Sequence, residues 1–148
     1  MKTLLHCLLA MMIAGPASMA AENHQHKTIP GPQGGRILES SPLHSEFFVR
    51  ADRKVSVTFY DAALKPVAPG GREVKVIAEA KTGKATLEFE KTGDAFVSRS
   101  ALPAGDGYRI VVQIRNDPAA KPQNFRIDYH TEICGECKRA EYACICGH

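Results

Sequence analysis

Residues 73–90 read EVKVIAEAKTGKATLEFE and contain two strand-like runs joined by a short turn. In the first run, 73–80, Val74, Val76 and Ala78 fall at alternating positions, and the second run, 84–90, repeats this pattern with Ala85, Leu87 and Phe89. A period of two places the apolar side chains of a β-strand on one face. The intervening KTGK segment favours a tight turn, so we predict a β-hairpin here.

Runs of the same kind recur at a spacing of roughly ten residues, which is typical of antiparallel sandwiches. The others cover residues 36–39, 46–50, 54–60, 95–98, 108–115 and 124–129. In the run 54–60, Val55, Val57 and Phe59 predict a buried face, and Thr58 is expected to face solvent. We therefore predict an all-β fold, an antiparallel immunoglobulin-like β-sandwich of about 7–8 strands over residues 34–129.

Tyr108 opens one of the predicted strands directly after a Gly-Asp-Gly turn. This position resembles the tyrosine corner of immunoglobulin-like domains, in which the hydroxyl bonds to a backbone group upstream. The alternative is a tyrosine that only packs at the start of a strand. The core Trp and the intersheet disulfide of antibody domains are missing, so the resemblance concerns the architecture alone.

The composition is that of one soluble domain: 148 residues, 44% hydrophobic and 24% charged. A net charge of +3 with scattered Lys and Arg argues against nucleic-acid binding. We find no Ser-His-Asp order, no glycine-rich phosphate loop and no distinctive carboxylate pair, and expect a non-enzymatic protein.

The first twenty residues have the pattern of a secretory signal peptide. A basic start precedes an apolar run of eleven residues, 4–14, which is too short to span a bilayer. Small residues at 17–20 predict cleavage after Ala20, and the alternative is a retained anchor. We expect export to a bacterial periplasm, no membrane span after cleavage, and a flexible polar lead-in over residues 21–33.

The C-terminal segment 130–148 reads HTEICGECKRAEYACICGH and holds every cysteine that remains after signal cleavage. Cys134 and Cys137 form a C-x2-C pair, and Cys144 and Cys146 form a C-x-C pair six residues later. Four thiolates arranged in this way suit Zn²⁺ or Cu⁺. His130 and His148 flank the cysteines and are candidate additional or substitute ligands.

The alternative for these cysteines is a pair of disulfides, since thiols outside the cytoplasm meet an oxidising environment. Bridges Cys134–Cys146 and Cys137–Cys144 would staple a small hairpin of an envelope interaction module. Strand-like alternation ends near Tyr129, before the first of these cysteines. We therefore expect the sandwich core to close without the tail.

Residues 31–38, GPQGGRIL, followed by EFFV at 46–49, resemble a segment of the periplasmic adaptor subunits of heavy-metal efflux pumps. In that family a Gly-Pro-x-Gly-Gly-Arg run leads into a small β-domain. The resemblance covers residues 31–50, and the hairpin and barrel parts of an adaptor are missing. It implies a metal-handling context in the cell envelope, with a metal-efflux complex as an expected partner.

Overall fold

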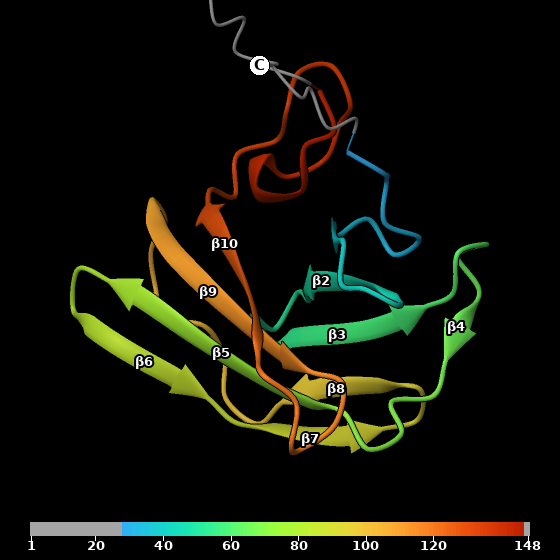
Figure 1. Ribbon diagram of the computed structural model, residues 1–148. Helices are drawn as coiled ribbons and strands as arrows, with labels where there is room; N and C mark the ends of the chain where they lie inside the picture. Colours follow the sequence, from blue (N-terminus) through green and yellow to red (C-terminus); the bar gives the residue numbers. More distant parts are fainter. Residues whose placement is uncertain (1–27, 147–148) are drawn as a thin grey trace, which may run out of the picture.

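The computed structural model describes residues 28–146, and these form two antiparallel sheets (Figure 1). The predicted signal peptide and residues 21–27 of the predicted lead-in lie outside the described residues. The first sheet has the order β1-β2-β3-β8-β7, with β4 also paired to β3. Its strands are β1 (Arg36–Leu38), β2 (His44–Val49), β3 (Val55–Tyr60), β4 (Pro66–Val67), β7 (Phe89–Thr92) and β8 (Ala95–Ser98).

The second sheet has the order β10-β9-β5-β6. Its strands are β5 (Glu73–Ala80), β6 (Gly83–Leu87), β9 (Tyr108–Arg115) and β10 (Gln123–Tyr129). β5 pairs with β9 from Glu73↔Arg115 to Glu79↔Arg109, and the hairpin predicted around Gly83 is present as β5–β6. The all-β prediction is thus confirmed, and no helix among the described residues has the length and apolar character needed to cross a bilayer.

One hydrophobic core is shared by both sheets. The alternation predicted from the sequence decides which side chains enter it: in β9, Ile110, Val112 and Ile114 are fully buried, and the residues between them are not. β5 contributes Val76 and Ala78 in the same way. From the other sheet, the largest fully buried apolar side chains are Phe47, Val55, Val57 and Phe59.

The chain passes from one sheet to the other at Glu88, inside the run 84–90 that we predicted to be one strand. β6 ends at Leu87 in the second sheet, and β7 begins at Phe89 in the first. The prediction of a single strand was wrong because the alternation of apolar residues continues across the crossing. β4 was also missed, since two residues beginning with Pro66 give no strand pattern.

The last residues of the predicted lead-in cover the outer face of β3. The side-chain amide of Gln33 donates to the hydroxyls of Thr58 and Tyr60 over 2.9 and 3.1 Å. Every residue of β3 is therefore buried, and the prediction that Thr58 faces solvent was wrong. Alternation along β3 identifies the core face but says nothing of what covers the other face.

The carboxylate of Glu46, a fully buried side chain, holds this segment in place. It accepts hydrogen bonds from the backbone N–H groups of Gln33 and Gly35, at 2.9 and 2.8 Å, and from the hydroxyl of Tyr60 at 2.8 Å. A Cβ at Gly31 would meet this carboxylate, and one at Gly35 would meet the carbonyl of Phe47. Close packing thus explains Gly31 and Gly35 of the Gly-Pro-x-Gly-Gly-Arg run, and Gly34 adopts a positive φ of 93° that favours glycine.

Tyr108 forms the hydrogen bond expected of a tyrosine corner. Its hydroxyl donates to the carbonyl of Pro103, five residues upstream, over 3.0 Å. Its ring packs on Tyr129, with ring centroids 5.0 Å apart. The corner thus ties the loop before β9 to the end of the sheet from which the tail leaves.

The tail packs into the core, while closure of the core without it stays a prediction. Tyr142 and Ala143 belong to the same buried cluster as the strands. The Tyr142 ring lies edge-on to Phe47, at 6.0 Å between centroids, and at 5.6 Å from Tyr129. The sequence did not indicate this contact, because an aromatic residue in a short polar segment carries no strand pattern, although it can bury as much surface as a strand residue.

Candidate metal centre

The first half of the tail is a small hairpin that presents Cys134 and Cys137. Ile133 pairs with Ala140, the N–H of Cys134 donates to the carbonyl of Arg139, and the N–H of Lys138 donates to the carbonyl of Cys134. Lys138 adopts a left-handed conformation, with φ of 58°. The left-handed position of this turn thus falls on Lys138 and not on Gly135.

The second half of the tail brings Cys144 and Cys146 back to the hairpin. A single turn of 3₁₀ helix, η1 (Glu141–Ala143), buries Tyr142 and Ala143. The N–H of Glu141 donates to the carbonyl of Glu132, and that of Tyr142 donates to the carbonyl of His130. The buried turn therefore fixes where the C-x-C pair begins.

The four cysteine sulfurs gather in one place, as the sequence predicted. All four Sγ atoms lie within 4.8 Å of one another. The Cys134 and Cys146 sulfurs are 3.9 Å apart, and those of Cys137 and Cys144 are 3.6 Å apart. Cys134 is buried, and the other three cysteines are half-buried.

These separations fit a tetrahedral metal site. Zn–S bonds of about 2.3 Å at tetrahedral angles place neighbouring sulfurs about 3.8 Å apart. Both measured separations are close to this value and far beyond the roughly 2.05 Å of a disulfide. Four protein ligands leave no open position, which is the arrangement of structural zinc sites and not of catalytic ones.

No family model, curated protein or solved structure matches this chain.

The chain itself supplies hydrogen bonds to the sulfurs. The backbone N–H groups of Ile145 and Arg139 donate to Cys137 and lower the pKa of its thiol. The N–H of Cys146 donates to the Cys144 sulfur over 3.4 Å. Such donors stabilise a thiolate, and the same groups would orient the sulfurs around a cation.

Cys144 and Cys146 are harder to ionise than Cys137. Burial, together with the neighbouring thiols, raises the pKa of Cys146 well above its usual range. For Cys144 the N–H of Cys146 lowers the pKa, but burial and the neighbouring thiols outweigh it and the net shift is upward. A bound cation would lower the pKa of every thiol in the group, since it favours the thiolate forms.

Of the two candidate histidines, only His130 lies among the described residues, and it is not part of the cysteine group. It lies instead against Asp106, with 3.1 Å between Nδ1 and the carboxylate, and its side chain is half exposed. His148 lies outside the described residues. The side chains of Lys138 and Arg139, which follow Cys137, donate to the carbonyls of Gly135 and Gly31.

Proposed function

We propose that this chain is an exported, non-enzymatic metal-binding protein whose tail holds one Zn²⁺ ion through Cys134, Cys137, Cys144 and Cys146. The observation that carries the proposal is the mutual approach of all four sulfurs, with separations close to the edge of a ZnS₄ tetrahedron. Cu⁺ is the second candidate, because soft thiolate ligands also select it. The immunoglobulin-like sandwich is the proposed scaffold for this site.

The support for a periplasmic setting is the signal-like pattern of residues 1–20, and the support for a role in heavy-metal homeostasis or efflux is the resemblance of residues 31–50. In this setting the metal site would hold the tail on the sandwich. A metal ion that joins the hairpin to the C-x-C pair would hold Tyr142 in the core, because Tyr142 lies between the two pairs of ligands.

The second candidate is the disulfide-stapled interaction module. The sulfurs of Cys134 and Cys146 are 3.9 Å apart and those of Cys137 and Cys144 are 3.6 Å apart, and these are the pairs that two such disulfides would join. Either closure would hold the tail on the sandwich. The metal closure alone would require all four sulfurs to lie together, as they do.

The test is to express the full chain with its own N-terminal segment, recover it anaerobically, and measure bound Zn, Cu and Fe together with reactive thiols. We expect one zinc per chain and protection of all four tail thiols. Replacing zinc by Co²⁺ should give the intense visible absorption of a tetrahedral tetrathiolate. Two disulfides and no metal would favour the staple instead.

Three variants sharpen the result. Cys144→Ser combined with Cys146→Ser should abolish stoichiometric zinc binding, because two thiolates on a short hairpin hold zinc poorly. His130→Gln should leave zinc content and the Co²⁺ spectrum unchanged, since His130 pairs with Asp106. His148→Gln, tested in parallel, decides whether the last residue takes part. Retention of zinc by the double cysteine variant would contradict a shared four-sulfur site.

A further inference from the structure

A pocket of about 420 Å³ lies where the tail meets the β2–β3 turn. Four cationic side chains line it: Arg50 and Arg53 from the turn, and Lys138 and Arg139 from the tail hairpin. Aromatic side chains, among them Tyr129 and Tyr142, complete the wall. The pocket therefore exists only when the tail is seated on the sandwich.

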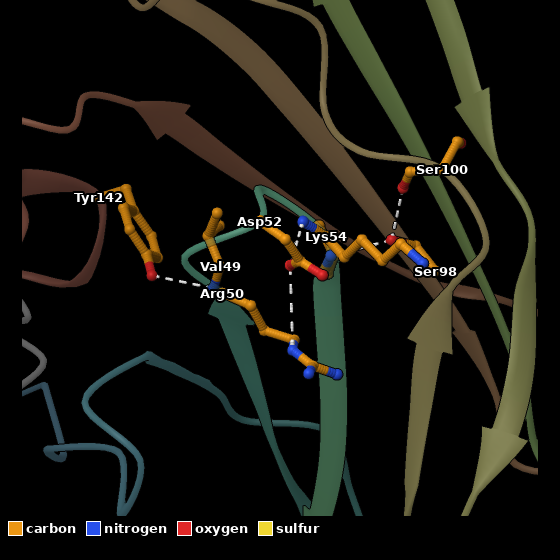
Figure 2. Close-up of polar contacts among 8 residues, drawn as sticks. Val49, Arg50, Asp52, Lys54, Ser98, Ser100 and Tyr142 are labelled. Atoms are coloured by element: carbon orange, nitrogen blue, oxygen red, sulfur yellow. Dashed lines mark hydrogen bonds and ion pairs between the residues drawn. The ribbon is translucent and has the colours of Figure 1, made fainter.

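No carboxylate lines this pocket within residues 28–146. The nearby acids are already engaged: Asp52 lies 3.9 Å from Arg50 (Figure 2), and Asp106 accepts two hydrogen bonds from Thr131. Among ion pairs between described residues, none involves Arg53, Lys138 or Arg139. Lys138 and Arg139 donate to backbone carbonyls, and these neutral acceptors leave the two positive charges uncompensated. Positive charges gathered in this way repel one another, and an anion between them would reduce that repulsion.

The backbone conformation at two of these cationic residues is a second observation that supports a functional site. Arg53 and Lys138 have φ angles of 59° and 58°, and the described chain has only one other non-glycine residue with positive φ, Leu64. A left-handed conformation costs a residue with a Cβ about 1–2 kcal/mol, and glycine would avoid that cost. Strain of this kind at one site is a reason to look for a function of the side chains.

We propose that this pocket binds a compact oxyanion with two negative charges, either a phosphate group or a small dicarboxylate. Guanidinium groups offer paired donors that match both chemistries. The aromatic walls exclude water and strengthen the attraction between ligand and cations. This ligand site goes beyond the proposed metal function, and the metal ion serves it only by keeping the tail in place.

The experiment titrates the full-length, metal-loaded protein by calorimetry at physiological ionic strength with inorganic phosphate and, separately, with succinate. Acetate serves as the monovalent comparison. We expect one dianion bound per chain and much weaker binding of acetate. Binding of phosphate alone assigns a phosphate site, and binding of succinate alone assigns a dicarboxylate site.

Arg53→Gly is the decisive variant, because glycine accepts the left-handed backbone while the cation is lost. We expect the affinity for the dianion to fall at least about tenfold, the size of a lost charged hydrogen bond, with the thermal midpoint unchanged or raised. Lys138→Gly should behave in the same way. Leu64→Gly relieves the same backbone conformation outside the pocket and should leave the affinity unchanged.

Lys121→Gln controls for net charge, since Lys121 is exposed in the β9–β10 loop, away from the tail. An equal loss of affinity in this variant would overturn the proposal, as would wild-type protein that binds neither dianion. Unchanged affinity in Arg53→Gly would also overturn it. Metal content is measured in every sample. Protein that contains no metal but binds the dianion would contradict the proposed metal function, while the proposal of an anion site would be retained.

Discussion

The backbone N–H of Val49 donates a hydrogen bond to the hydroxyl of Tyr142, 93 residues away in the chain, over 3.1 Å (Figure 2). Val49 is the last residue of β2, whose ladder with β3 ends there. The tail thus supplies an acceptor to the end of a strand. The ring of Tyr142 makes the apolar part of the contact, because it packs on Phe47 and Tyr129.

Replacing Tyr142 should separate these two contributions. Tyr142→Phe removes only the hydroxyl and should lower the free energy of unfolding by about 1 kcal/mol. Tyr142→Ala also empties the ring site and should cost about 3–5 kcal/mol. Urea unfolding followed by circular dichroism measures both. A loss below about 1 kcal/mol in the alanine variant would mean that the core closes without the tail.

Cys137 should react before Cys144 and Cys146 in the reduced, metal-free protein. Hydrogen bonds from the N–H groups of Ile145 and Arg139 lower its pKa, so it carries more thiolate at neutral pH than Cys146, whose pKa is raised. Substoichiometric iodoacetamide followed by peptide mass spectrometry identifies the modified residue. The alkylation rate should reach half its maximum below about pH 8.5, the usual thiol value.

Metal should abolish this selectivity by protecting all four thiols. The matched control is Cys137→Ser, in which the fast phase of alkylation should disappear while the slower thiols keep their rates. Faster modification of Cys146 than of Cys137 would contradict the hydrogen-bonding pattern described for the sulfurs.

Alkaline pH should destabilise the fold through its tyrosines. The chain has four tyrosines, and burial raises the pKa of each, that of Tyr108 to about 12. The unfolded chain ionises near pH 10, so the stabilisation is complete below pH 10 and is lost as pH rises through the folded-state values. Because the chain has no Trp, tyrosinate absorbance reports these groups directly. Native midpoints near pH 10 would contradict the burial.

Glu46→Gln tests how strongly the lead-in is held. The carboxylate accepts hydrogen bonds from two backbone N–H groups and from Tyr60, and an amide can offer only one oxygen to these three donors. We expect a loss of about 1.5–3 kcal/mol in the free energy of unfolding. Glu39→Gln, at an exposed position, is the control and should change it by less than about 0.5 kcal/mol.

Local sequence patterns predicted most of the strands because alternation is itself local. β5, β9 and β10 were found within a residue of their bounds, and the β5–β6 hairpin was found from its turn. The crossing at Glu88 was not predicted from the sequence, because Leu87 and Phe89 keep the alternation although their strands belong to different sheets. Which sheet a strand joins depends on pairing partners far along the chain.

The candidate site likewise has a part that the sequence predicted and a part that it did not. The spacing of Cys134, Cys137, Cys144 and Cys146 predicted that the sulfurs would converge, and they do. The contact of Tyr142 with β2 joins residues 93 positions apart, and nothing in its neighbours signals it. The cationic pocket likewise draws Arg53 and Lys138 from separate turns, and only the folded chain brings them together.

The single residue between β6 and β7 limits how this protein can be re-engineered. With only Glu88 between two sheets, one inserted residue would reverse the facing of every side chain in β6 or β7. A reporter or affinity peptide placed there would disrupt both sheets at once. The β9–β10 loop, residues 116–122, should tolerate insertions, because its ends belong to adjacent strands of one hairpin and its Lys121 is exposed. It is the position where added sequence should be carried without cost to the cysteine cluster at the other end of the molecule.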